Sequence, residues 1–127
     1  MSDHVKTVQA LFGCLGRGDI PGVLEHLAPD VRWEADWAMT PPPLLAPRIG
    51  REAVPEFFAA LAAYDMVRFE PLEFLAGGDW VAVPAEFELR HKATGKVAAD
   101  LEVTLWRFGP DGKVVWFRHV LDARLFE

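Results

Sequence analysis

The clearest indication of the fold is the segment at residues 80–91, which reads WVAVPAEFELRH. Every second side chain of this stretch is apolar, and the residues between them include two glutamates and an arginine. Successive side chains of a β-strand point to opposite faces, so a period of two predicts a strand with one buried face. We expect the glutamates to lie outside and the apolar set to face the interior. That set is Val81, Val83, Ala85, Phe87 and Leu89.

Similar strand patterns flank this segment on both sides. Short turn sequences rich in Gly, Pro and Asp separate them, such as Gly77-Gly78-Asp79 and Gly109-Pro110-Asp111-Gly112. Three further long strands are therefore predicted, at residues 66–76, 97–108 and 113–124.

The first half of the chain predicts helices and one strand. Apolar residues recur at helical spacing in residues 5–15, and Asp19 is expected to cap a second, short helix. Residues 31–35 alternate like a strand, whereas residues 37–50 contain three consecutive prolines and are expected to form a loop. A third helix is expected from about Arg51. The resulting order, α-α-β-α-β-β-β-β, predicts a single α+β domain over residues 1–127 with the helices on one face of a sheet.

Composition narrows the classes of partner. The net charge is −6 and the 13 Lys and Arg residues are scattered, which argues against a nucleic acid or an anionic membrane surface as partner.

No apolar run approaches the length of a membrane span, and residues 1–6 lack the pattern of a secretory signal. One cysteine, Cys14, excludes an internal disulfide and fits a reducing cytoplasm. Five Trp and nine Phe supply much flat ring surface, which is typical of a pocket wall as well as of a core.

A family resemblance runs along essentially the whole chain. It rests on a helix, Gly18-Asp19, a second helix, then residues 28–33 (APDVRW), and a meander that closes on residues 112–118 (GKVVWFR). In these features the chain resembles the NTF2-like superfamily, and within it the SnoaL-like and ketosteroid-isomerase-like branch. The resemblance implies a curved, mostly antiparallel (mixed) sheet that wraps into a cone closed by three N-terminal helices. It also implies an apolar pocket and a homodimer that pairs through the outer sheet face.

The resemblance also assigns candidate site residues. It places His119, Glu102 and Asp100 inside the cone as candidate acid and base groups. It implies a substrate-binding wall made of Trp33, Asp36, Trp37, Phe87, Thr104, Trp106 and Phe117. Two carboxyls two residues apart on one strand face, in an apolar site, would raise each other's pKa, so that one could act as a general acid or hydrogen-bond donor while the other carboxyl or His119 acts as base. Such chemistry needs no metal and no organic cofactor, and we expect neither.

The strand at 97–108 allows two opposite orientations. A simple amphipathic interpretation turns Leu101, Val103 and Leu105 inward and leaves the acids in solvent. The resemblance instead turns Glu102 and Thr104 inward, and the Leu/Val face becomes a dimer surface.

The function predicted from the sequence is the binding of a small apolar, cyclic molecule, with cofactor-free isomerase, cyclase, dehydratase or hydrolase chemistry on it. The ketosteroid-isomerase signature is mostly absent, because its phenol, general-base and oxyanion-hole positions fall on Leu11, Ala35 and Thr104. A non-catalytic ligand-binding or dimeric assembly module of the same fold is therefore the alternative. In a third interpretation the aromatic side chains fill the cone completely.

Overall fold

The computed structural model of the protein describes residues 3–35 and 43–126. Helix α1 (Asp3–Gly16) buries one face at helical spacing, formed by Val5, Val8, Leu11 and Cys14. Helix α2 (Ile20–Glu25) begins after Asp19, whose carboxylate accepts a hydrogen bond from the backbone N–H of Gly22 at 3.0 Å, which confirms the predicted cap. Within the described residues, no helix has both the length and the apolar character that crossing a bilayer requires.

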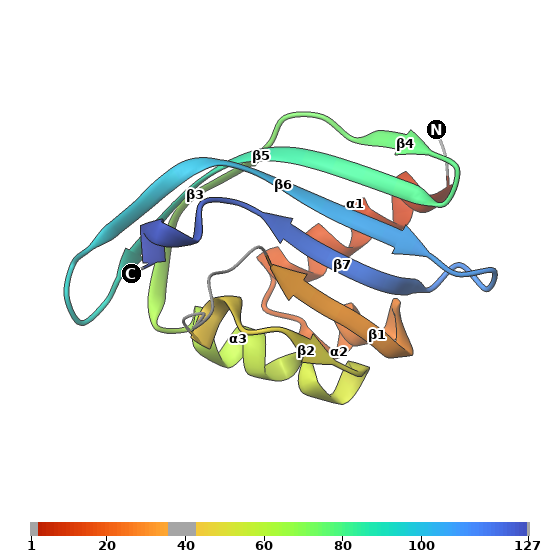
Figure 1. The fold of residues 1–127 in the computed structure, drawn as a ribbon, viewed down its shortest axis with the longest axis horizontal. Coiled ribbons are helices and arrows are strands. Elements are labelled where there is room, and N and C mark those ends of the chain that lie inside the picture. Colours follow the sequence, from red (N-terminus) through yellow and green to blue (C-terminus); the bar gives the residue numbers. More distant parts are fainter. Residues whose placement is uncertain (1–2, 36–42, 127) are drawn as a thin grey trace.

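The helices pack against one curved sheet (Figure 1). Its strands are β1 (Leu27–Ala35), β2 (Arg48–Ile49), β3 (Tyr64–Pro71), β4 (Leu75–Gly77), β5 (Trp80–His91), β6 (Val97–Phe108) and β7 (Val114–Val120). The strand order is β2-β1-β7-β6-β5-β3, and β4 also pairs with β5. Only the β1–β7 pair is parallel among the described strands, so the sheet is mixed and the predicted fold class is confirmed.

The predicted strand at residues 66–76 is interrupted. β3 ends at Pro71, and β4 resumes the pairing with β5 only at Leu75. The backbone N–H of Leu72 donates to the carbonyl of Pro84 at 2.8 Å, so residue 84 of β5 turns its backbone toward this edge. Because Pro84 has no N–H, it cannot donate a hydrogen bond back to β3, and the regular pairing with β5 is interrupted there.

The predicted C-terminal strand is too long at its end. β7 stops at Val120, and residues 123–126 form a short 3-10 helix, η3 (Ala123–Phe126). The carboxylate of Asp122 accepts hydrogen bonds from the backbone N–H and the guanidinium of Arg124, each at 3.0 Å. This local side-chain bond favours a turn over continued strand pairing.

The segment after β1 brings two leucines into the core. Residues Pro43–Leu45 form the 3-10 turn η1, in which Leu44 and Leu45 are buried. A second 3-10 turn, η2 (Arg51–Ala53), precedes α3 (Pro55–Leu61), where Pro55 occupies the first helical turn without loss of a hydrogen bond. The predicted third helix therefore starts four residues later than expected.

Candidate functional site

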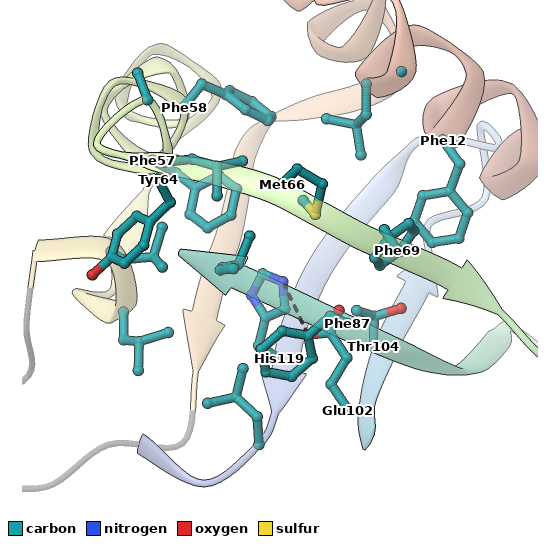
Figure 2. A pocket seen from close by; sticks show the side chains of 18 of the residues that line it. Phe12, Phe57, Phe58, Tyr64, Met66, Phe69, Phe87, Glu102, Thr104 and His119 are labelled. Carbon is teal, nitrogen blue, oxygen red and sulfur yellow. Dashed lines mark ion pairs between the residues drawn. The ribbon is translucent and has the colours of Figure 1, made fainter. Parts of the chain in front are cut away.

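The concave side of the sheet encloses a cavity of about 630 Å³, a volume in the range of small-molecule sites. Its wall is built from residues of α1, α2, η1, α3 and η3 and of strands β1, β3, β5, β6 and β7 (Figure 2). Most of the lining side chains are apolar. The aromatic members are Phe12, Trp33, Phe57, Phe58, Tyr64, Phe69, Phe87, Trp106, Phe117 and Phe126. A cavity of this size shows that the rings do not fill the cone completely.

The orientation of β6 decides which polar groups reach the cavity. Glu102, Thr104 and Trp106 are buried and line it, whereas Leu101 on the other face is 50% exposed. The orientation implied by the family resemblance is the one observed. The simple amphipathic interpretation is wrong, because the face of β6 that it turned inward, with Leu101, Val103 and Leu105, is the outer face of the sheet.

Glu102 and His119 come together on the cavity wall. His119 lies opposite Thr104 in the β6–β7 register, and Glu102 is two residues away from Thr104 on the same face. The Nε2 atom of His119 is 3.8 Å from Oε2 of Glu102, and the two side chains are 15% and 7% exposed (Figure 2). The sheet geometry therefore holds an acid and a base side by side on neighbouring strands.

Burial shifts the two groups in opposite directions. Loss of water around the carboxyl raises the pKa of Glu102 to about 7. The same loss lowers the pKa of His119 to about 4, because it penalises the charged imidazolium. Near neutral pH the imidazole is a neutral proton acceptor, and the carboxyl keeps its proton in a large fraction of molecules.

Two further contacts fix the surroundings of this pair. The indole N–H of Trp106 donates to the hydroxyl of Thr104 at 3.0 Å, which orients that hydroxyl on the cavity wall. The centroid of the His119 ring is 5.4 Å from that of Phe57, with the rings stacked, and 4.6 Å from that of Phe117, with the rings edge to face. These flat neighbours restrict the imidazole and keep its environment apolar.

The remaining predicted site residues divide into three groups. Trp33, Phe87 and Phe117 line the cavity, with Trp33 stacked on Phe117 at a centroid distance of 3.9 Å. Asp100 is exposed and stands outside the cavity lining; its carboxylate accepts from the N–H of Leu101 at 2.8 Å. Asp36 and Trp37 lie outside the described residues. Glu102 and His119 are thus brought together without Asp100.

Several lining residues escaped the sequence analysis. Phe12, Phe57 and Phe58 come from helices, where helical spacing marks them as core but does not indicate that they border a void. Tyr64 also lines the cavity, and burial raises the pKa of its hydroxyl. No group of three or more His, Cys, Asp or Glu side chains suited to a metal ion is found in residues 3–35 and 43–126.

Comparison with known proteins agrees with this architecture. The SnoaL-like domain family matches residues 8–117. An NTF2-like protein of unknown function from Burkholderia pseudomallei K96243 is 31% identical, with a TM-score of 0.87 over 99% of this chain and 95% of that one. TerC, co-crystallised with polyporic acid, is 28% identical, with a TM-score of 0.84 over 98% of this chain and 95% of its own.

A third solved structure has the same fold. An NTF2-like protein from Burkholderia xenovorans LB400 is 26% identical, with a TM-score of 0.81 over 96% of this chain and 91% of the other. None of the functionally curated proteins matches. The family match spans most of the sequence, and it confirms the resemblance seen in the sequence: the chain belongs to the SnoaL-like family of NTF2-like proteins.

Proposed function

We propose that the protein binds a small, largely apolar cyclic molecule in its cavity and performs cofactor-free acid–base chemistry on it. The observation that carries this proposal is the Glu102–His119 pair, which lies in the wall of a mainly apolar, aromatic cavity. Keeping two ionisable groups away from water costs stability, so a site of this kind is typical of a function. TerC, which has the same fold, was co-crystallised with polyporic acid, and this supports the proposal that a small molecule binds here.

The proposed chemistry is proton transfer next to a carbonyl. Neutral His119 accepts the proton as the C–H bond breaks, and the electron pair moves to the carbonyl oxygen; the buried imidazolium so formed is stabilised by the carboxylate that is left when Glu102 gives its proton to that oxygen. The protonated carboxyl of Glu102 donates a hydrogen bond, or its proton, to that oxygen. Return of a proton to a different carbon would isomerise the substrate, whereas attack by the enolate on a second carbonyl would cyclise it. The two side chains are close enough to serve one functional group of a substrate.

A second candidate is a ligand-binding protein of the same fold without catalysis. The residue at the phenol position of ketosteroid isomerases is Leu11, which is fully buried and does not line the cavity. In addition, the 3.8 Å between His119 and Glu102 exceeds a direct hydrogen bond. In that case the pair would hold the polar end of a ligand and transfer no proton.

One experiment separates the two candidates. Binding is followed by the fluorescence of 1-aminoanthracene, a flat neutral dye, and catalysis by incorporation of solvent deuterium next to the carbonyl of 2-tetralone. The enzyme candidate requires deuterium incorporation that both Glu102→Gln and His119→Gln abolish. Asp100→Asn is the matched control, since it removes an exposed acid from the same strand. Dye binding without enhanced exchange would favour the binding protein, and absence of both would refute the proposed function.

We also propose that the protein is a homodimer that pairs through the outer face of the sheet. Leu101 and Trp80 are 50% and 42% exposed there, and Trp80 contacts Trp116 across Arg107. Val103 and Leu105 continue this apolar strip between them along β6. An apolar strip on a sheet face in contact with water is unfavourable, and a second copy would cover it.

A further inference from the structure

Exposed residues are found on only part of the described cavity lining. Among its described lining residues, the exposed ones are confined to three segments: the end of α1 with the following turn, the end of α3, and the start of β3. They are Gly16, Gly18, Ala62, Met66, Val67 and Arg68. The other described lining residues are buried or half-buried. Solvent therefore reaches the cavity wall between these three segments.

A bulge in β3 shapes one side of this opening. The pairing with β5 shifts register between Met66 and Arg68, so that Val67 is an extra residue in the edge strand. In a regular strand only every second side chain would border the cavity, but here Met66, Val67, Arg68 and Phe69 all line it. Met66 and Val67 remain 51% and 53% exposed. Figure 2 shows β3 crossing the cavity, with Met66 and Phe69 on it.

Small residues leave the opposite side of the opening free. An added Cβ at Gly16 would meet no atom within 4 Å, and Gly16 has no left-handed backbone conformation that would forbid a side chain. Ala62 carries only a methyl group and has a helical backbone. The guanidinium of Arg68 is paired with the carboxylates of Glu70 and Glu86, neither of which lines the cavity. The rim is therefore mainly apolar and unobstructed.

From this arrangement we infer that the opening bounded by Gly16, Ala62 and the β3 bulge at Val67 is the portal through which an apolar ligand enters and leaves the cavity. The small residues at positions 16 and 62 set its width and hence the size of ring system that passes. This inference rests on the proposed function, because a portal has a role only if the cavity receives a ligand. It concerns passage alone, since these rim residues lie on segments that carry neither Glu102 nor His119.

A portal can be recognised because it controls rates more than affinity. We would narrow it with Gly16→Phe and, independently, with Ala62→Phe, and measure 1-aminoanthracene binding by stopped-flow fluorescence. Gly77→Phe is the matched control: this glycine on β4 also has open space and no left-handed backbone, but it does not line the cavity. Circular dichroism would establish that each variant is folded. If one rim variant does not fold, the other still tests the portal.

The expected result is a fall of about tenfold in both the association and the dissociation rate constant in each rim variant, with the dissociation constant within about twofold of the control. Rate constants equal to those of Gly77→Phe would overturn the portal. A weaker dissociation constant with an unchanged association rate would also overturn it, because the new ring would then occupy the binding space. Absence of dye binding in the wild type would overturn the proposed function, and the portal with it.

Discussion

The Nε2 atom of His119 lies 3.8 Å from Oε2 of Glu102, and the two groups respond to burial in opposite ways. The raised pKa of Glu102 means that the folded protein keeps a proton which the unfolded chain loses above about pH 4.5. The lowered pKa of His119 means that the folded protein lacks a proton which the unfolded chain holds below about pH 6.5. Between these two pH values the pair carries one proton in both states. Its net contribution to the pH dependence of folding is therefore near zero.

Glu102→Gln should reveal the contribution of His119 to the pH dependence of stability. With His119 alone, the unfolded state binds the extra proton between about pH 4 and pH 6.5, so the free energy of unfolding should rise with pH across that window. The slope, relative to wild type, should reach at most about 1.4 kcal/mol per pH unit. Urea unfolding at several pH values measures it, with Asp100→Asn as control. A slope that stays at the wild-type value would show that His119 is not held neutral.

His119→Gln should give the opposite slope. Glu102 then remains as the group that holds an extra proton in the folded state, so the free energy of unfolding should fall as the pH rises from about 4.5 to about 7. The same unfolding series measures it, and His91→Gln is a control on a partly exposed histidine at the end of β5. If stability instead rose with pH in this window, Glu102 would be ionised in the folded protein and could not act as the proton donor proposed above.

The sequence was enough to predict the fold but left one orientation open. The strand at 80–91 was predicted correctly because its two faces differ sharply in polarity. β6 was ambiguous because both of its faces mix apolar and polar residues, and only tertiary packing decides which one meets the helices. The resemblance favoured the observed orientation. It also grouped Asp100 with Glu102, but Asp100 is exposed and does not line the cavity, although its pairing partner on β5, Phe87, does.

Thr104→Val should destabilise the protein although it preserves shape. It removes the acceptor of the Trp106 indole N–H, which would then be buried without a hydrogen bond. A loss of about 1–3 kcal/mol in the free energy of unfolding is expected. Thr104→Ser keeps the hydroxyl and is the matched control, so it should retain more stability than the valine variant. Greater stability of Thr104→Val than of Thr104→Ser would mean that this hydrogen bond contributes little.

Arg48 should stabilise one part of the cavity wall. Its guanidinium is buried and donates to the carbonyls of Pro43 and Ala46, each at 2.7 Å, which holds the turn that carries Leu44 and Leu45. Arg48→Gln should therefore cost about 2 kcal/mol or more of stability, because hydrogen bonds from a charged donor are lost. It should also weaken dye binding, since both leucines line the cavity.

The control for Arg48 is Arg68→Gln, judged by stability alone. Arg68 is 54% exposed, and its ion pairs are on the surface, so its loss should cost much less stability than the loss of Arg48. Thermal unfolding of both variants checks the contrast. Equal losses would show that the hydrogen bonds of Arg48 to the turn do not stabilise it more than a surface ion pair does.

Leu101→Glu and Leu105→Glu should dissociate the proposed homodimer without altering the cavity. Both side chains point away from the cavity on β6, and a new carboxylate on each copy would have to be buried and would repel other charges across the interface. Sedimentation velocity should show a change from dimer to monomer, while 1-aminoanthracene still binds. Glu88→Gln is a suitable control, because it alters a polar residue on the same outer face of β5. A wild-type protein that sediments as a monomer would exclude the dimer, and dimeric Leu101→Glu and Leu105→Glu variants would place the interface elsewhere on the molecule.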